Sequence, residues 1–162
     1  MAVKPAVLPT IRLVAPVGDK DPARTAAESL IDAIAARDYA RLFGVLARDS
    51  RLRYLIPAGQ GQVAGAADVA AKYFAWFGDA IELDLRQVLV ERISDRTSAR
   101  YQFLLRNVRN GHDWEVVEQQ AYLDVDAEGR IEAIDLVCSG FRPVRGRGKL
   151  ARRGAMHSTP DR

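Results

Sequence analysis

Four consecutive runs decide the fold of this chain: IELDLRQVLVER (81–92), TSARYQFLLRNV (97–108), WEVVEQQAYLDV (114–125) and IEAIDLVCSGF (131–141). Apolar and polar residues alternate in each run, and a period of two is the pattern of a half-buried β-strand. The connections are short. Asn110-Gly111, typical of a tight two-residue hairpin, joins the second and third runs, and residues 126–129 supply the next turn. The runs therefore predict a long antiparallel meander.

The alternation also predicts which side chains share a face of the sheet. In the first run, Ile81, Leu83, Leu85 and Leu89 would lie on the inner face, and Glu82, Asp84 and Arg86 on the outer face. The inner face of the other runs would carry Tyr101, Phe103, Leu105, Val117, Gln119, Ala121, Leu123, Ile134, Leu136 and Cys138. This wall is mostly apolar, with Tyr101 and Gln119 as its polar groups.

The residues before the runs predict three helices. Asp21-Pro22 suits the first turn of a helix that ends near Arg37, and Thr25 and Glu28 match a capping box there. Asp38 suits the N-cap of a shorter second helix. The apolar residues that would face inward are Ala27, Leu30, Ile31 and Ile34 in the first helix, and Leu42, Phe43, Val45 and Leu46 in the second.

A short strand and a turn precede the third helix. Arg51–Ile56 reads as the strand and Pro57–Gly61 as a glycine-rich turn. The third helix would carry an apolar stripe at helical spacing, formed by Val69, Tyr73, Trp76 and Phe77. Such a stripe ordinarily packs in the core, although Tyr73 and Trp76 would also suit the lid of a pocket.

Helices followed by a meander predict an α+β fold, with a cone-shaped, curved antiparallel sheet packed on three N-terminal helices. The chain has 162 residues, 48% hydrophobic and 28% charged, which fits one globular domain. We expect an N-terminal extension at 1–20, a folded domain at 21–141 and a basic flexible tail at 142–162. In the extension, Ile11–Ala15 would pack at an edge or stay loose.

Charge and cysteine content narrow the function classes. The formal net charge of +3 comes from the tail, where Lys and Arg far outnumber the single acid, Asp161. That tail could contact phosphates, but it lacks the interleaved aromatic residues that stack on bases, so nucleic acid is a minor expectation. No apolar run is long enough to cross a membrane, and a lone Cys138 suits a reducing compartment, so we expect a cytoplasmic protein without zinc or another metal.

Three local patterns occur in an order that is more specific than any of them alone. They are Ala35-Ala36-Arg37-Asp38 between the first helices, Ile56-Pro57 followed by Gly65 before the third helix, and Gly129-Arg130-Ile131 before the last run. From about Asp21 to Phe141 the chain resembles the nuclear transport factor 2-like superfamily, particularly its SnoaL-like polyketide-cyclase and ketosteroid-isomerase branches. The resemblance implies a conical pocket between helices and sheet and commonly a homodimer, but no cofactor and no particular reaction.

The catalytic patterns of two branches do not match this sequence. The ketosteroid-isomerase branch needs a tyrosine and two acids where this chain has Leu30, Ile56 and Ala121, and aliphatic groups cannot shuttle protons. A bulge in the third run would reverse this conclusion by turning Glu118 or Gln120 inward. The Arg-x-Asp pair of the epoxide hydrolases appears reversed, as Asp84-Leu85-Arg86, which we interpret as a solvent-exposed ion pair.

The expected site is therefore a pocket without an assigned catalytic residue. Its candidate lining residues are Tyr54, Tyr73, Trp76, Tyr101, Phe103, Gln119 and Cys138. Cys138 is expected to be a small buried residue, since neither histidine of the chain is placed to activate a thiol. On the outer face, Trp114 and Tyr122 among charged residues are the best indication of a partner surface.

Three functions remain open from the sequence, and whether the chain is an enzyme is undecided. Binding of a small apolar molecule in the conical pocket is the leading interpretation. A cyclase, isomerase or dehydratase acting on a polyketide- or steroid-like substrate is the alternative, and an inward carboxylate would favour it. The third is a dimeric interaction module with a basic nucleic-acid-binding tail.

Overall fold

The computed structural model describes residues 4–5, 10–14, 21–109, 111 and 113–144. Within them lie the helices α1 (Pro22–Ala36), α2 (Tyr39–Val45) and α3 (Ala66–Phe77). The strands are β1 (Ile11–Val14), β2 (Leu46–Ile56), β3 (Gly59–Ala64), β4 (Ala80–Ile93), β5 (Arg96–Asn107), β6 (Trp114–Val125), β7 (Ile131–Cys138) and β8 (Arg142–Pro143). The predicted basic tail continues beyond Val144 and, with the nucleic-acid hypothesis that rests on it, lies outside the described residues.

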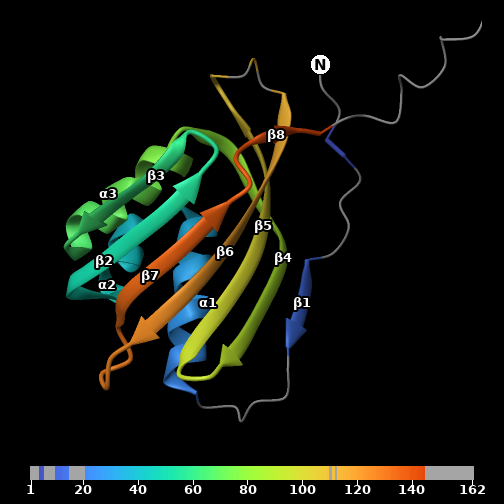
Figure 1. Ribbon diagram of the computed structural model, residues 1–162. Coiled ribbons are helices and arrows are strands. Elements are labelled where there is room, and N and C mark those ends of the chain that lie inside the picture. Colours follow the sequence, from blue (N-terminus) through green and yellow to red (C-terminus); the bar gives the residue numbers. More distant parts are fainter. Residues whose placement is uncertain (1–3, 6–9, 15–20, 110, 112, 145–162) are drawn as a thin grey trace, which may run out of the picture.

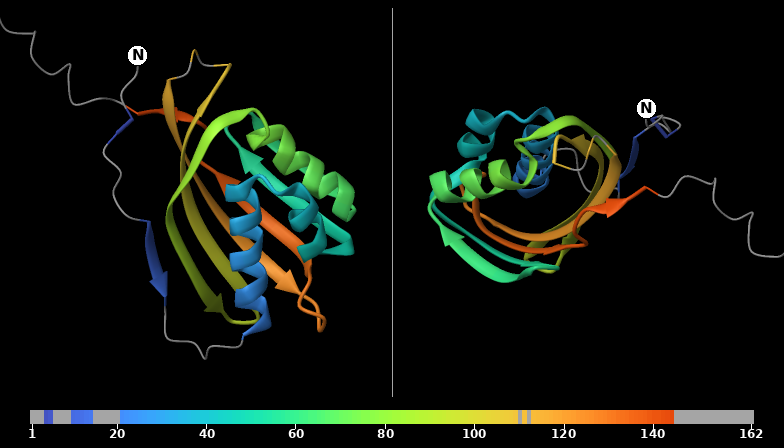
Figure 2. Two further views of the ribbon diagram at one scale, coloured as in Figure 1. Left: turned by 180° about the vertical axis from the view of Figure 1, so that it is seen from behind. Right: turned by 90° about the horizontal axis from the view of Figure 1, so that it is seen from above.

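One curved sheet covers three helices. Its strand order is β1-β4-β5-β6-β7-β2-β3, and β8 pairs with β6. Figure 1 shows the sheet in front of the helices, and the view from above in Figure 2 shows it curling around them without closing. The predicted α+β fold with a cone-like sheet is confirmed, and the concave face holds the core.

The sheet is mixed: the predicted antiparallel pairing holds for the meander but not for the strands added at its two edges. The meander β4-β5-β6-β7 is antiparallel as predicted, but β2 pairs with β7 in parallel, and β1 pairs with β4 in parallel. The reason is topological: β2 arrives from the helical half of the chain and adds to the free edge of the last meander strand. β1 pairs at the opposite edge of the sheet. Of the two expectations for that segment, packing at an edge or staying loose, the first is therefore confirmed.

The inner face of the meander follows the predicted alternation from β5 onward. Tyr101 pairs with Gln119, and Gln119 pairs with Cys138, so these three residues form one row across β5, β6 and β7. Tyr101 and Gln119 are buried. Glu118 points to the outer face, where it makes an ion pair with Arg100. The predicted register of β6 is therefore confirmed.

Two register shifts in β4 make part of the predicted inner face of that strand wrong. Register shifts occur between Ala80 and Glu82 and between Leu85 and Gln87. The first leaves Ile81 exposed, and the second moves Val88 and Val90 inward in place of Leu89. A single inserted residue reverses the alternation of everything after it, and the sequence pattern carries no mark of the insertion.

The helix starts were predicted correctly at Asp21 and Asp38. The Asp21 carboxylate accepts a hydrogen bond from the Ala23 amide at 3.0 Å, and Asp38 caps α2 in the same way. The capping box is wrong, because the Thr25 hydroxyl donates to the Asp21 carbonyl. α2 is also shorter than predicted: it ends at Val45, and its Phe43 is 51% exposed.

The connection between α2 and α3 holds a hairpin that the sequence showed only in part. β2 is longer than the predicted Arg51–Ile56, and the end of the predicted turn belongs to β3, which pairs antiparallel with β2. Gly61 lies opposite Tyr54, and any Cβ at Gly61 would collide with the Tyr54 hydroxyl. Glycine therefore serves strand packing here rather than a turn.

The hairpin between β5 and β6 is longer than the predicted two-residue turn. Strand β5 ends at Asn107 and β6 begins at Trp114, so residues 108–113 connect the two strands. Asn110 and His112 lie outside the described residues. Among the helices that are described, none combines the length and the apolar character needed to cross a lipid bilayer.

Candidate functional site

A pocket of about 470 Å³ opens where β2 and β7 end. Its walls are largely apolar, and its lining residues are Ile56, Pro57, Ala58, Trp76, Gln119, Cys138, Ser139, Gly140, Phe141 and Arg142. They come from the end of β2, the β2–β3 turn, α3, β6, the end of β7 and β8. Because parallel pairing makes β2 and β7 end on the same side of the molecule, these segments meet there (Figure 1).

The segment after β7 shapes the mouth of this pocket. The Ser139 amide donates to the Glu118 carbonyl and the Glu118 amide donates to the Ser139 hydroxyl, both at 2.9 Å, which holds the segment against β6. Gly140 then adopts a φ of +73°, and a Cβ on it would lie 2.6 Å from Pro57 Cγ. Only glycine satisfies both the backbone conformation and this close approach.

Gln119 places a polar group in the pocket. The residue is 2% exposed, and its side-chain Oε1 has no hydrogen-bond partner among the described residues. A buried amide oxygen without a partner costs about 1–3 kcal/mol of folding free energy. A ligand that donates a hydrogen bond to this oxygen would recover part of that loss.

Cys138 lies beside Gln119 in the same row. Its thiol is half-buried, and the Gly140 amide donates to its sulfur at 3.4 Å. The row thus brings an amide and a thiol to the pocket, with the Tyr101 ring continuing it into the core.

Two buried phenols lie at the core end of this row. Tyr73 of α3 and Tyr101 of β5 are fully buried, and neither hydroxyl has the geometry of a hydrogen bond within the described part of the chain. Burial raises the pKa of both phenols above the ordinary value, and each hydroxyl affects the pKa of the other. Both groups are therefore neutral at physiological pH and can donate hydrogen bonds, but they do not act as bases.

The structure divides the seven predicted lining residues into three groups. Trp76, Gln119 and Cys138 line the pocket. Tyr73, Tyr101 and Phe103 belong to the core behind it, with the Tyr101 and Phe103 rings 5.6 Å apart. Tyr54 does not line this pocket: it is half-buried, its ring packs edge-on against Trp76 of α3 with ring centroids 5.3 Å apart, and the residue also borders a groove on the outer side of the sheet.

The positions discussed for catalysis carry no acid into the pocket. Leu30 and Ala121 are buried in the core and Ile56 lines the pocket, as the register predicted. The Asp84 carboxylate makes an ion pair with Lys4 at 2.6 Å; its predicted pairing with Arg86 stays a prediction.

One inward carboxylate was missed by the sequence reasoning. Glu115 is buried on the inner face near the start of β6, and the Asn107 amide donates to it at 3.5 Å. Extending the alternation from Gln119 through Val117 towards the start of the strand would have placed Glu115 on the inner face. It lines none of the described pockets, and the residues of the β7–β8 segment that do line one had no signal in the sequence.

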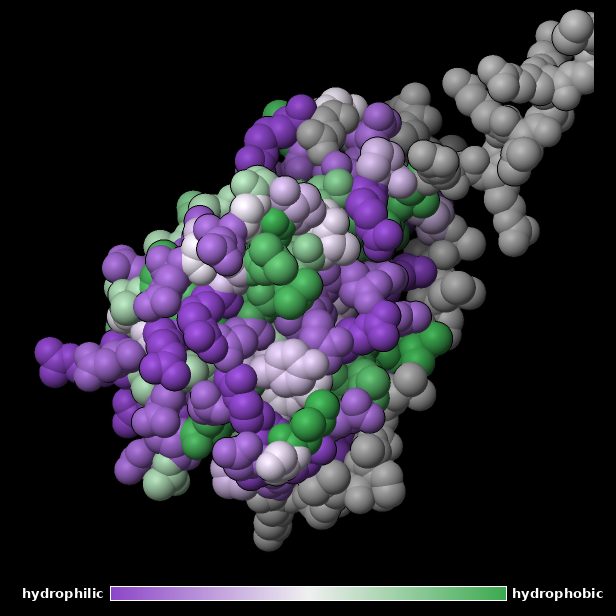
Figure 3. Space-filling model, viewed as in Figure 1, coloured by the Kyte–Doolittle hydropathy of each residue, from purple (hydrophilic) through white to green (hydrophobic). Residues whose placement is uncertain are grey.

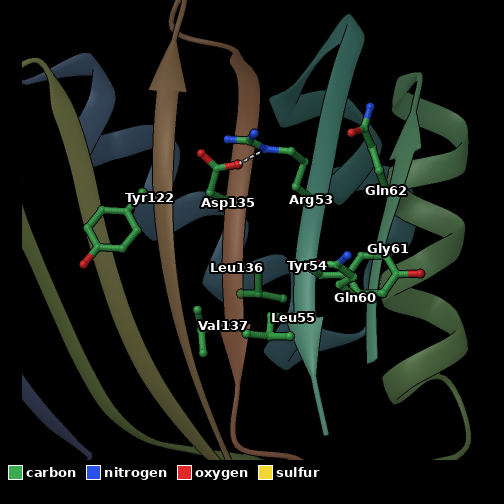
Figure 4. A pocket seen from close by; sticks show the side chains of 10 residues that line it. All are labelled: Arg53, Tyr54, Leu55, Gln60, Gly61, Gln62, Tyr122, Asp135, Leu136 and Val137. Carbon is green, nitrogen blue, oxygen red and sulfur yellow. Dashed lines mark hydrogen bonds and ion pairs between the residues drawn. The ribbon is translucent and has the colours of Figure 1, made fainter. Parts of the chain in front are cut away.

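A second hollow, of about 670 Å³, is a groove on the outer face of the sheet (Figure 4). Arg53 and Asp135 form an ion pair across it at 2.6 Å, and Arg96 bridges Asp135 to Asp124. The hydrogen bond from Arg53 lowers the pKa of the Asp135 carboxyl to about 2. Asp135 is therefore ionised at neutral pH and is unsuited to proton transfer there.

Exposed apolar residues lie in the same groove. Leu55 and Val137 pair across β2 and β7, and each is more than half exposed. Figure 3 shows hydrophobic surface within this otherwise hydrophilic face. Trp114, predicted to offer its ring to a partner, is instead buried, with the Lys4 and Arg106 cations each 5.4 Å from its ring centre.

Metal binding has no support in the described ranges, where no three His, Cys, Asp or Glu residues come together in a group that could hold an ion. The polar side-chain groups among the lining residues are one amide, one thiol, one hydroxyl, one indole N–H and one guanidinium. This set suits recognition of a polar group on an apolar molecule.

No protein-family model and no curated protein matches this sequence. Solved structures do match. A candidate ketosteroid isomerase from Kribbella flavida is 21% identical, with a TM-score of 0.52 over 83% of this chain and 91% of its own. A candidate SnoaL-like polyketide cyclase from Shewanella denitrificans is 14% identical, with a TM-score of 0.59 over 74% and 92%.

A Mycobacterium tuberculosis protein solved in complex with estradiol-17beta-hemisuccinate is 15% identical to this chain, with a TM-score of 0.56 over 72% of this chain and 92% of its own. Likeness at these identities concerns the fold. The predicted resemblance is confirmed at that level: the chain has the cone-like α+β fold of the SnoaL-like and ketosteroid isomerase-like proteins of the nuclear transport factor 2-like superfamily.

Proposed function

We propose that this chain binds a small apolar molecule in the pocket between β2, α3, β6 and β7. The observation that carries the proposal is that Gln119, whose buried Oε1 has no hydrogen-bond partner among the described residues, lines a pocket whose other walls are largely apolar. A ligand with an apolar body and one hydroxyl would bury the body against Trp76 and Phe141 and donate a hydrogen bond to Gln119. Both contributions favour binding.

The pocket supports binding better than catalysis. Proton transfer needs a carboxylate or another base at the substrate, and none of the described lining residues is acidic. Glu118, the acid that would have favoured an enzyme if turned inward, pairs with Arg100 on the outer face. The solved neighbour in complex with a steroid hemisuccinate agrees with a pocket of this fold holding an apolar ligand.

Isothermal titration calorimetry with estradiol as the probe tests this proposal. Wild-type protein is expected to bind, and Gln119→Leu to weaken binding about three- to tenfold, the value of one hydrogen bond. Gln102→Leu, an amide on the outer face of β5, is the matched control and should bind like the wild type. Blocking the pocket with Ala58→Trp should abolish binding. Unchanged affinity in both pocket variants would refute the site.

We also propose that two copies associate through the outer groove. Leu55 and Val137 expose apolar surface there, and Tyr122 lies beside them (Figure 4). Burial of such a patch against a second copy would remove it from water. Light scattering after size exclusion should give a dimer that Val137→Asp converts to a monomer. A wild-type monomer at high protein concentration would contradict this proposal.

Two expectations from the sequence stay proposals. The folded unit at 21–141 with a terminal extension on each side is one of them. A cytoplasmic location is the other, supported by a single cysteine that has no second thiol in the chain with which to form a disulfide.

A further inference from the structure

Cys138 brings the only thiol of the chain to the pocket between β2, α3, β6 and β7. The residue is half-buried among the lining residues, and its sulfur accepts a hydrogen bond of 3.4 Å from the backbone amide of Gly140, which also lines the pocket. An N–H group directed at the sulfur stabilises negative charge there, which is the charge of a nucleophilic thiolate. A thiol alone does not define a site, so the neighbouring groups matter.

Gln119 lies directly opposite Cys138 on the neighbouring strand. The two residues pair across β6 and β7, both line the pocket, and the side chains of such a pair lie about 5 Å apart on one face of a sheet. Gln119 is 2% exposed, and its Oε1 has no hydrogen-bond partner among the described residues. This unsatisfied acceptor is an independent indication of a ligand, and it calls for a hydrogen-bond donor beside the thiol.

The other lining residues restrict both the ligand and the chemistry. Ile56, Pro57, Trp76 and Phe141 offer apolar surface to a hydrocarbon chain, and none of the ten lining residues is acidic or a histidine. A reaction at the thiol therefore receives no general base from the lining. Conjugate addition suits such a site, because the carbonyl group of the acceptor takes up the negative charge and no leaving group has to be protonated.

We propose that Cys138 forms covalent adducts with apolar α,β-unsaturated aldehydes that carry a hydroxyl group next to the carbon that reacts. The inference rests on the proposed binding function and adds the chemical class of the ligand and the residue that it modifies. The hydroxyl donates a hydrogen bond to Gln119 Oε1, which holds the neighbouring β-carbon beside the sulfur. The hydrocarbon chain packs against the apolar walls.

The reaction is an addition in which atoms and electrons balance. The sulfur forms a bond to the β-carbon, the carbon–carbon double bond becomes a single bond, and the resulting enolate takes a proton from water at its α-carbon. The proton of the thiol passes to water. The product therefore has the mass of the protein plus the whole aldehyde, without a leaving group and without an oxidant or reductant.

Three probes separate the hydroxyl group from the apolar chain: 4-hydroxy-2-nonenal, 2-nonenal and 4-hydroxy-2-hexenal. The first and second differ in the hydroxyl, and the first and third in chain length. Intact-mass spectrometry of the full chain gives the rate of adduct formation, and peptide mapping assigns the adduct to Cys138, because lysines also react with aldehydes. Each rate is divided by that of the same aldehyde with glutathione, which removes differences in intrinsic reactivity.

The corrected rates test each contact separately. Wild-type protein should prefer 4-hydroxy-2-nonenal to 2-nonenal by about three- to tenfold, the value of one hydrogen bond. Gln119→Leu should remove this preference, and Gln102→Leu, on the outer face of β5, should keep it. The longer hydroxyaldehyde should react about tenfold faster than the shorter one, the value of about two buried methylene groups.

A relocated thiol is the matched control for the pocket. Cys138→Ser combined with Glu132→Cys moves the only thiol to an exposed position near the other end of β7, at a residue that does not line the pocket. This variant should react with the three aldehydes in the same ratios as glutathione.

The outcomes distinguish this inference from the function on which it rests. If wild-type Cys138 reacts in the same ratios as glutathione while estradiol binds in calorimetry, the covalent inference is overturned and the binding function stands. A hydroxyl preference that persists in Gln119→Leu would also overturn the inference. Absence of both estradiol binding and any dependence on chain length would refute the binding function, and this inference with it.

Discussion

Glu118 and Gln119 are consecutive residues of β6 that face opposite sides of the sheet. The Gln119 amide lies in the apolar pocket, and the Glu118 carboxylate makes an ion pair with Arg100 on the outer face. One step along the strand thus decides whether the pocket contains an amide or an acid. The orientation of these two residues therefore distinguishes a binding site, which needs only the amide, from a catalytic one, which needs the acid.

Replacing the acid at Glu118 with an amide and the amide at Gln119 with an acid should change the free energy of unfolding by very different amounts. Glu118→Gln removes one surface ion pair and should lower the free energy of unfolding by less than about 1 kcal/mol, with ligand affinity unchanged. Gln119→Glu buries a carboxylate without a partner and should destabilise the fold by about 3 kcal/mol or more at neutral pH. Urea unfolding measures both. Similar losses in the two variants would contradict the assigned orientations.

Gln119→Leu is expected to stabilise the protein while it weakens ligand binding. The substitution removes the unpartnered Oε1 and leaves an apolar side chain of similar size, so the free energy of unfolding should rise by about 1 kcal/mol. Thermal unfolding without ligand gives the comparison, with Gln102→Leu as the outward-facing control. A destabilised Gln119→Leu variant would mean that the amide has a partner in the free protein.

Gly140→Ala should destabilise the pocket mouth for two separable reasons. Alanine is strained at a φ of +73°, and its Cβ would press on Pro57. Gly111→Ala, with a φ of +63° and nothing near the added Cβ, carries only the backbone cost of about 1 kcal/mol. The difference between the two free energies of unfolding measures the contact with Pro57, and Pro57→Ala in the same chain should relieve it.

Asp135 should make stability depend on acid pH. Its pKa falls from 3.8 to about 2 on folding, chiefly through the Arg53 hydrogen bond, so its ionised form stabilises the native state above about pH 4. That contribution is lost as the pH falls from about 4 through 2, and it amounts to at most about 2 kcal/mol. Urea unfolding across this range should show a shallower dependence in Asp135→Asn. Equal slopes would show that the ion pair contributes nothing.

Cys138 offers a direct report on occupancy of the pocket. It is the only cysteine of the chain, half-buried in the pocket lining, so alkylation by iodoacetamide is specific to it. A saturating ligand should slow the alkylation severalfold, followed by intact-mass spectrometry. Tris(hydroxymethyl)aminomethane, a polar molecule with no apolar body, serves as the control additive. An unchanged rate under saturating ligand would place the ligand elsewhere.

Local patterns predicted the helices and most of the inner face. Asp21 and Asp38 announce helix starts because a carboxylate can satisfy the free amides of the first turn, whatever lies elsewhere in the chain. The row of Tyr101, Gln119 and Cys138 followed from alternation alone. The errors at Ile81 and Leu89 share one cause, since a bulge is recognised only when the partner strand is in place.

The pocket itself was only partly predictable. Trp76, Gln119 and Cys138 could be named because each lies in a periodic element. The rim residues Gly140 and Arg142 belong to a short segment without periodicity, so their position depends on where β6 and β7 leave them. Tyr54 was predicted to line the pocket. It lies where β2 pairs with β3, and it also borders the groove on the outer face.

The sequence by itself determined most of the inward side chains, through local periodicities of 3.6 in the helices and two in the strands. Only the tertiary structure decided that β2 lies beside β7 in parallel, which brings Pro57 against Gly140 and creates the pocket. The two strands are far apart in the sequence, and their pairing depends on how the whole sheet closes over the helices. No local pattern encodes that long-range contact, so the site appears only in the folded chain.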